Sequence, residues 1–345
     1  MIKILENVDL TKFNTFGIKA NAKYFFELKN EEDIKELFET KEFKNNRKLF
    51  LGGGSNILIT QDFDGIVVLN RLKGIQIIKE DNENVWIKSM GGELWDDLVN
   101  FTVDKGYWGI ENMALIPGTV GAGPVQNIGA YGTELKDVIE NVEVYDIETG
   151  EVRIFTKAEC EFEYRGSVFK NKLKGKYFIS AVVLKLNKKE LKNIKYKALQ
   201  EYLNKNNIEV KNPKDISNIV SEIRRSKLPD PKVLGSAGSF FKNVYVDKKK
   251  LEGLKKEYGD IPSFKEDEMI KIPAGWLIEQ CGPLQDGVSW KGYKEGCVGV
   301  YEKQALVLVN YGGATGEEIK NLAFKIMDSV YQKFGLKLTP EVNLI

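Results

Sequence analysis

Residues 117–132 read P-G-T-V-G-A-G-P-V-Q-N-I-G-A-Y-G. The stretch holds five glycines and two prolines and has no charged side chain. Glycine permits positive φ and lets a ligand approach the main chain, and proline fixes φ and removes a donor. Backbone N–H groups left free in such a segment bind phosphates. A second cluster, L-G-G-G-S-N at residues 51–56, lies upstream, so the sequence predicts a ligand with more than one phosphate, a nucleotide or dinucleotide.

Neither glycine cluster fits a familiar nucleotide-binding motif. Gln126 stands where the third glycine of G-x-G-x-x-G belongs, and the residues after Asn56, Ile57-Leu58-Ile59, are strand-like instead of helical. The chain has no G-x-x-x-x-G-K-[ST] motif, which excludes a P-loop kinase. Each cluster alone is also compatible with an ordinary glycine-rich turn, but two clusters in one chain favour phosphate binding.

Composition limits the class of protein. The 345 residues suggest two or three domains. Lys and Arg total 51 against 50 Asp and Glu, a balance that argues against a nucleic-acid partner. The N-terminus does not resemble a signal peptide, and no apolar run is long enough to span a bilayer. We therefore expect a soluble, cytoplasmic protein without a membrane partner. We also expect a monomer.

The chain contains no histidine, which restricts its chemistry. Catalysis by Ser-His-Asp or Cys-His is excluded, and proton transfer must use Ser, Tyr, Lys, Cys or a carboxylate. The three cysteines, Cys160, Cys281 and Cys297, form no C-x-x-C pair. We therefore expect neither a disulfide framework nor a metal site.

Hydrophobic periodicity predicts an α+β fold with clustered strands and helices instead of a regular βαβ alternation. Strands are expected at 22–28, 66–69, 75–79, 85–90 and 177–186, with a hairpin at 142–155 that turns at Thr149-Gly150. Helices are expected at 31–40, from Leu94 to Gly106, after an Asp215 N-cap, and from a Thr315–Glu318 capping box to a Gly335 C-cap. The Lys- and Asn-rich residues 187–214 are interpreted as an extended loop or insertion.

Three further positions have side chains suited to catalysis, although each has an ordinary structural explanation. Arg165, in Tyr164-Arg165-Gly166, offers the planar fork that clamps a carboxylate or phosphate, but surface arginines in turns are commoner. Ser239 precedes Phe240 and Phe241, which could simply begin a strand with its aromatics in the core. Glu341 lies five residues from the chain end, where carboxylates are usually solvated.

In their order along the chain, these motifs resemble the UDP-N-acetylenolpyruvoylglucosamine reductase family. The resemblance runs nearly end to end and rests on residues 14–17, 51–56, 117–132, 164–165, 227–231, 238–243, 274–279, 304–310 and 340–342. Two positions depart from the family pattern: Val244 stands where proline is usual, and the stretch 121–124 has a glycine where alanine is expected. Neither change removes a chemical group, so we expect consequences for packing only.

The resemblance implies an α+β fold with an FAD-binding region of the vanillyl-alcohol-oxidase type and a separate α+β substrate-binding domain. Its implied boundaries are 1–70 for the first FAD-binding lobe and 71–215 for the second, with an inserted substrate-covering loop at about 187–214. The substrate-binding domain would span 216–330, and a C-terminal segment, 331–345, would return to the active site.

The resemblance also implies the cofactor, non-covalent FAD, and NADPH as co-substrate. The residues that would bind FAD lie in the two glycine clusters: Gly52, Gly53, Gly54, Ser55 and Asn56, and Pro117, Gly118, Thr119, Gly121, Gln126, Asn127, Gly129, Ala130 and Tyr131.

The implied reaction reduces UDP-N-acetylglucosamine enolpyruvate to UDP-N-acetylmuramate, a precursor of cell-wall peptidoglycan. NADPH gives a hydride to FAD, and flavin N5 passes it to the enolpyruvyl double bond. Arg165 and Glu341 would stabilise the enol form, since a carboxylic acid kept neutral in a dry site can donate a hydrogen bond. Ser239 would supply the proton, a role that typically contributes 10²–10⁴ in rate.

The resemblance also implies five residues that bind the substrate: Tyr164, Tyr196, Lys227, Asn243 and Gln304.

Two other functions stay open at this point. An oxygen-using flavin oxidase would need the cofactor loops but not Ser239 with Glu341. A non-catalytic nucleotide-sugar or flavin-binding module would tolerate the loss of Ser239.

Overall fold

The computed structural model describes residues 2–266, 268–283 and 288–345. The chain divides into two compact units. The first consists of Met1–Val8, Asn21–Gly53 and Phe63–Ser226, and the second of Asp9–Ala20, Gly54–Asp62 and Lys227–Ile345. Each unit has its own sheets and its own hydrophobic core, which is expected of units that are stabilised by separate apolar clusters.

One sheet of the first unit has four strands in the order β1-β2-β5-β3. These are β1 (Leu5–Asp9), β2 (Asn21–Leu28), β5 (Phe63–Asn70) and β3 (Arg47–Leu51). Strands β2, β5 and β3 are parallel, as the connection through helices α1 (Glu32–Glu39) and α2 (Lys41–Lys44) requires. The inner strand β5 is almost entirely buried, which explains its apolar run from Ile66 to Leu69.

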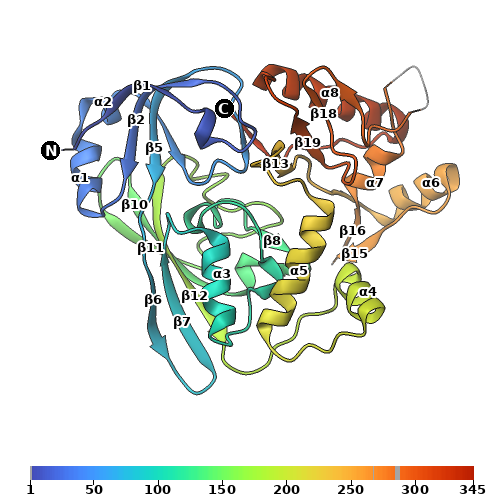
Figure 1. Ribbon diagram of the computed structural model, residues 1–345, viewed down its shortest axis with the longest axis horizontal. Helices are drawn as coiled ribbons and strands as arrows, with labels where there is room; N and C mark the ends of the chain where they lie inside the picture. The colour runs from blue at the N-terminus through green and yellow to red at the C-terminus, as the bar shows by residue number, and fades with distance from the viewer. Residues whose placement is uncertain (1, 267, 284–287) are drawn as a thin grey trace. The chain divides into compact units, whose positions relative to one another are not determined.

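The other large sheet of this unit is antiparallel and has the order β11-β10-β12-β7-β6 (Figure 1). Its strands are β6 (Ile75–Glu80), β7 (Asn84–Met90), β10 (Ile139–Asp146), β11 (Val152–Thr156) and β12 (Tyr177–Asn187). The predicted hairpin is confirmed, with Gly150 in the left-handed region at φ 71°. Helices α3 (Trp95–Asp104) and α5 (Pro213–Lys227) share one core with this sheet.

Short elements build the glycine-rich stretch 117–132 and its neighbours. These are the 3-10 turns η2 (Glu111–Met113), η3 (Val120–Ala122) and η4 (Leu135–Asp137), and the two-residue strands β8 (Gly129–Ala130) and β9 (Thr133–Glu134). Regular structure cannot continue here because five glycines and two prolines interrupt it.

Two expectations about residues 187–227 were wrong. The expected loop at 187–214 contains a helix, α4 (Lys197–Asn206), whose apolar residues Leu199 and Leu203 are buried while its lysines and asparagines face outward. Asp215 is not the N-cap of α5, because that helix begins two residues earlier at Pro213. The Asp215 carboxylate instead accepts hydrogen bonds from the N–H groups of Lys211 and Asn212, at 2.7 and 3.1 Å.

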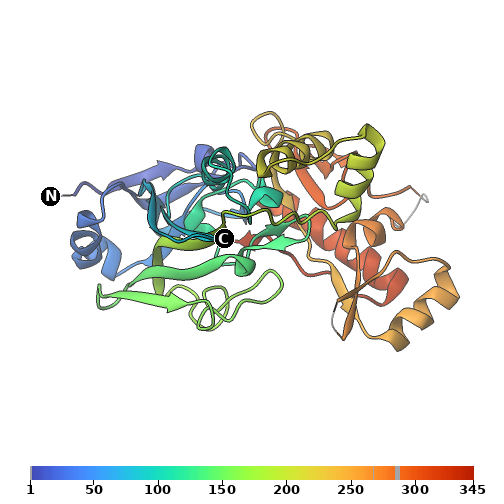
Figure 2. The same ribbon diagram turned by 90° about the horizontal axis from the view of Figure 1, so that it is seen from below.

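The second unit contains three small sheets. The first has the order β13 (Gly235–Ser239), β19 (Val307–Asn310), β18 (Val298–Val300) and β17 (Lys294–Glu295). The second has the order β14 (Val244–Val246), β16 (Met269–Ile272) and β15 (Phe264–Glu266), and α6 (Lys248–Tyr258) packs on it (Figure 2). The third pairs β4 (Ile57–Leu58) with β20 (Asn343–Leu344) in parallel.

Helices α7 (Ala274–Glu279) and α8 (Gly316–Phe334) contribute to the core of this unit. The short 3-10 helix η1 (Thr11–Phe13) also belongs to this unit. The predicted capping box of α8 is confirmed, since Glu318 N donates to Thr315 Oγ1 at 3.2 Å and Thr315 N donates back to the Glu318 carboxylate at 2.7 Å. Gly335 ends the helix in the left-handed region at φ 61°. In the part of the chain described, no helix is both long enough and apolar enough to cross a membrane.

Candidate functional site

The two glycine clusters meet in the first unit. A Cβ on Gly53 would lie 2.9 Å from the Cα of Gly118, and a Cβ on Gly52 would collide with the hydroxyl of Thr119. Only glycine permits this approach of two backbones. Among the described residues, the N–H groups of Gly53, Gly118 and Thr119 donate to no protein acceptor. The contact therefore leaves main-chain donors available to an anionic ligand.

The first half of the 117–132 stretch is held in place by backbone bonds. Trp95 N, at the start of α3, donates to Gly118 O at 3.0 Å, and Gly121 N donates to Gly91 O at 2.9 Å. Asp96 accepts a hydrogen bond from Leu115 N at 2.6 Å. Because these bonds fix both sides of the stretch, its free donors are ordered before a ligand binds.

The second half of the stretch contains two non-glycine residues at positive φ, Asn127 at 46° and Tyr131 at 49°. Asn127 is fully buried and donates to the Glu134 carboxylate and to Glu163 O, both at 3.1 Å, while its Oδ1 accepts from Lys136 N. Its side chain is thus engaged within the protein and braces the loop. Such strained positions persist only where the surroundings determine them, and they gather at functional sites.

Arg165 lies beside this stretch and is also at positive φ, 52°. Its Nη2 donates to Gly129 O at 2.8 Å, and its Nη1 lies 3.6 Å from the Glu134 carboxylate. The guanidinium also lies over the ring of Tyr164, 5.1 Å from the ring centroid. The structure therefore brings three predicted residues, Gly129, Tyr164 and Arg165, into one cluster.

Arg224, on α5, is a residue that the sequence analysis missed. Its Nε is enclosed by protein and has no hydrogen-bond partner among the residues described. Burial lowers the pKa of the guanidinium; Tyr131 and Asp96 act in the opposite direction, and the cation of Arg165 lowers it further. The folded surroundings therefore disfavour this charge, and an anion bound next to the glycine stretch would balance it. Nothing in the local sequence distinguishes Arg224 from Arg225, its solvent-exposed neighbour.

Tyr196 is the N-cap residue of α4, in the inserted segment, and is 46% exposed. Its ring contacts the ring of Tyr131 edge to face, with centroids 5.2 Å apart. A predicted substrate residue thus touches a predicted cofactor residue. Burial raises the pKa of the Tyr131 hydroxyl, so this group remains a neutral hydrogen-bond donor.

Part of the upstream glycine cluster belongs to the second unit. Gly54, at φ 63°, packs so closely on the backbone of Phe13 that no Cβ fits, and its carbonyl accepts from Thr15 N at 3.1 Å. Asn56 donates from Nδ2 to Glu341 O at 3.3 Å. Gly54 thus contacts residues 13–15, and Asn56 contacts the C-terminal segment of the chain.

In the second unit the backbone of Glu341 pairs with the residue that follows Ser239, although Ser239 and Glu341 are 102 positions apart in sequence. Glu341 N donates to the carbonyl of Phe240, the residue after Ser239, at 2.8 Å. A bulge between Ser236 and Ser239, with Gly238 at φ 68°, shifts the register of β13 against β19. Bulges of this kind redirect a side chain at the end of a strand. Phe240 and Phe241 are both 1% exposed, which confirms their expected place in the core.

Two predicted substrate residues lie at the first turn of α7. Asn243 Oδ1 accepts a hydrogen bond from Ala274 N at 3.0 Å. Gln304 Oε1 accepts from Leu306 N at 3.3 Å and would lie 3.2 Å from a Cβ on Gly275. Lys227 is the last residue of α5 and is exposed.

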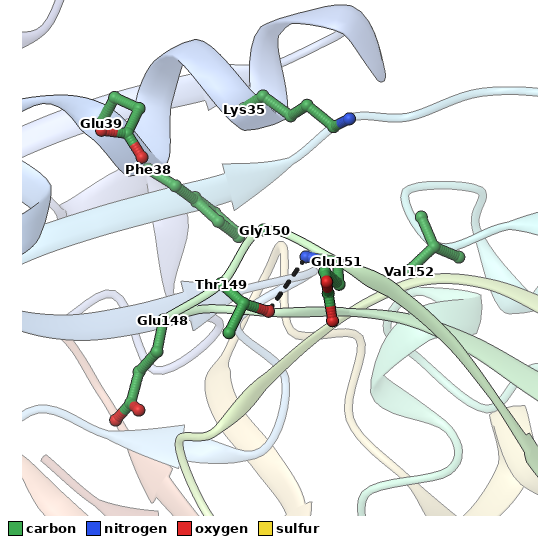
Figure 3. Close-up of a pocket in the computed structure, with 8 residues that line it drawn as sticks. All are labelled: Lys35, Phe38, Glu39, Glu148, Thr149, Gly150, Glu151 and Val152. Carbon is green, nitrogen blue, oxygen red and sulfur yellow. Dashed lines mark hydrogen bonds between the residues drawn. The ribbon is translucent and has the colours of Figure 1, made fainter.

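A surface pocket of about 580 Å³ lies elsewhere in the first unit, between α1 and the β10–β11 turn (Figure 3). It is lined by Lys35, Phe38, Glu39 and residues 148–152. None of these is a predicted site residue, and its acidic rim does not suit a phosphate.

Comparison with known proteins finds two family models that match separate parts of the chain. The profile described as "FAD binding domain" matches residues 22–156, and the profile "UDP-N-acetylenolpyruvoylglucosamine reductase, C-terminal domain" matches residues 230–345. The UDP-N-acetylenolpyruvoylglucosamine reductase of Flavobacterium johnsoniae is 48% identical over 346 residues and covers 100% of both chains. The chain belongs to the UDP-N-acetylenolpyruvoylglucosamine reductase family.

Other members of the reductase family match over similar lengths. The Porphyromonas gingivalis reductase is 43% identical, with 99% of each chain covered. The crystal structure of the Thermus caldophilus reductase superposes with a TM-score of 0.66 at 23% identity, covering 100% of this chain and 99% of that one. The expected fold class, an FAD-binding fold of the vanillyl-alcohol-oxidase type with a separate α+β domain, is confirmed.

Proposed function

We propose that the protein uses NADPH and FAD to reduce UDP-N-acetylglucosamine enolpyruvate to UDP-N-acetylmuramate for peptidoglycan synthesis. The observation that carries this proposal is the full-length match, at 48% identity, to a protein named for that reductase activity. The FAD-binding profile supports the cofactor. We further propose a cytoplasmic monomer with the lobe boundaries that the family resemblance implies.

The residues of the first unit fit an FAD pyrophosphate. The Gly53–Gly118 contact leaves main-chain N–H groups free, and the Arg224 Nε has no protein partner among the residues described. These donors and the arginine charge would hold the phosphates or another anionic part of the cofactor. FAD, when bound, supplies a two-electron carrier between NADPH and the enolpyruvyl double bond.

The catalytic roles that we propose for this chain's residues follow from the charge that the reduction creates. Adding a hydride equivalent to the double bond moves negative charge into the adjacent carboxylate. Arg165 suits that charge because its planar donors match a carboxylate. Glu341 would hydrogen-bond the same enol form. Ser239 would give its Oγ proton to the neighbouring carbon and regain one from solvent, so the substrate gains two electrons and two hydrogens.

The side chains that we propose for substrate binding are those of Tyr164, Tyr196, Lys227, Asn243 and Gln304. A lysine suits a diphosphate as a point charge, and amide or hydroxyl groups suit sugar oxygens. Asn243 Oδ1 accepts a hydrogen bond from Ala274 N, which fixes the orientation of the Asn243 side chain.

An anaerobic two-step titration tests the function. The purified protein should absorb near 450 nm, lose this colour with NADPH, and regain it with the UDP-enolpyruvyl sugar. Recovery of colour with oxygen but not with the sugar would indicate a flavin oxidase. A protein that releases no flavin on denaturation would contradict every flavin-based function.

A further inference from the structure

The start of the inserted segment is exposed and polar, yet it follows a defined path. After Asn187, whose backbone pairs with that of Trp108, the chain has no regular structure until α4 begins at Lys197. Most residues from 188 to 197 are exposed. Lys188, Lys189 and Lys192 form surface ion pairs, and Lys188 Nζ also donates to Asp81 O at 3.0 Å. Such pairs contribute little to stability, so something else must hold this stretch.

A buried amide, that of Asn112, grips the segment from inside the first unit. Asn112 is 1% exposed, and its Nδ2 donates to Tyr131 O at 2.9 Å and to Asn193 O at 2.8 Å. Its two N–H bonds thus join the end of the glycine stretch to the inserted segment. Both partners are carbonyls, so this orientation of the amide is required. The Oδ1 of Asn112 has no partner among the residues described, so its two donors are its main contribution.

Asn193, in the inserted segment, also donates hydrogen bonds to the segment that carries Tyr131. Its Nδ2 donates to Gly132 O at 2.9 Å and to Thr133 Oγ1 at 3.1 Å. Three residues later, Tyr196 packs edge to face on Tyr131. The two asparagines therefore form an amide clasp, four hydrogen bonds that hold the segment carrying Tyr196 against the segment carrying Tyr131.

We propose that Asn112 and Asn193 are positioning residues, which fix Tyr196 before the UDP-sugar binds. This inference rests on the proposed function, because there Tyr196 is a substrate contact. A segment that is already ordered pays less conformational entropy when its ligand arrives. Ile194 packs against the core of the first unit, but Tyr196 and the lysines around it are exposed. Without the clasp, the tyrosine would be ordered only at the expense of substrate affinity.

The test uses Asn193→Ala in the flavin-loaded protein, together with the isostere Asn193→Asp. Both lose the two side-chain donors, but Asn193 is only partly buried, so the fold should survive. Two hydrogen bonds correspond to about a 30-fold rise in the open fraction of the segment. Trypsin should therefore cut at Lys192, Lys195 and Lys197 about 30-fold faster, as followed by mass spectrometry.

Kinetics separate positioning from a purely structural role. Both variants should raise the KM for the UDP-enolpyruvyl sugar by about tenfold or more, with kcat changed less and with the rate of flavin bleaching by NADPH unchanged. Asn206→Ala is the matched control, because its amide donates to Tyr202 O within α4, and it should leave both cleavage and KM as in the parent.

Three outcomes would count against these ideas in different ways. Unchanged tryptic cleavage in both Asn193 variants would overturn the clasp. Faster cleavage with an unchanged KM would overturn the positioning role. A parent protein that turns over no UDP-enolpyruvyl sugar would instead overturn the proposed function, while the cleavage result would still judge the clasp by itself.

Discussion

Replacing Arg224 with methionine should stabilise the flavin-free protein and weaken its binding of FAD. The Nε of Arg224 is enclosed and has no partner among the residues described, and burial lowers the pKa of the group, so the folded state disfavours its charge. Methionine keeps much of the packing of the aliphatic stem without the charge. The two effects have opposite signs, which a general loss of structure would not produce.

The structure sets the size of each effect. Partial burial penalises the charge of Arg224, and Asp96 and Tyr131 offset part of that penalty, so we expect a net gain of about 1–3 kcal/mol in unfolding free energy. That gain should raise the Tm of the flavin-free protein by about 2–8 °C. Losing charged hydrogen bonds to the cofactor, about 1.5–3 kcal/mol, should raise the Kd for FAD about 10- to 100-fold.

Calorimetry of the flavin-free protein measures the change in Tm, and a fluorescence titration with FAD measures the change in Kd. Arg225→Met is the matched control, since Arg225 is exposed on the same helix and its loss should change stability by less than about 0.5 kcal/mol. A lower Tm in Arg224→Met combined with an unchanged Kd for FAD would refute the reasoning, because Arg224 would then be a structural cation.

The remaining predictions concern two glycines and two cysteines. Gly53→Ala should weaken FAD binding by about tenfold or more, as measured by the same titration, because its Cβ would lie 2.9 Å from Gly118 Cα; Gly253→Ala, on helix α6 with open space around its Cβ position, should stabilise the protein by about 1 kcal/mol. In the native protein a thiol reagent at pH 8 should modify the exposed Cys297 but not Cys160, since burial raises the pKa of Cys160 to about 12 and leaves only about 10⁻⁴ of it as thiolate. The stability that this buried neutral thiol contributes should be complete below pH 9 and should decline as the pH rises towards 12. Labelling of Cys160 as fast as Cys297 would contradict the prediction for the thiols.

Strong local patterns made much of the fold predictable. The 142–155 hairpin, the capping box at Thr315 and the Gly335 C-cap each depend on residues close in sequence, so the pattern alone identifies them. Helix α4 was missed because only Leu199 and Leu203 mark its buried face, and lysines and asparagines occupy most of the rest. The start of α5 was misplaced by two residues because Asp215 resembles an N-cap. The helix in fact begins at Pro213, and proline is well suited to the first position of a helix.

The site was predictable only where glycine marks it. Close contact between Gly53 and Gly118 leaves a trace in the sequence, because no other residue fits there. Arg224 and Asn112 leave none: each matters through partners far away in the chain, and an arginine in R-R-S-K or an asparagine in E-N-M has no distinctive local pattern. Arg224 and Asn112 matter because their polar groups are buried by the tertiary structure, and this burial can be seen only in the folded protein.

The most direct test of the proposed chemistry is to measure both half-reactions in Ser239→Ala. Loss of a proton donor should leave flavin bleaching by NADPH within about twofold of the parent rate. It should slow the return of colour with the UDP-enolpyruvyl sugar by about 10²–10⁴-fold. If both half-reactions proceed at the parent rates, Ser239 is not the proton donor and the proposed mechanism is wrong.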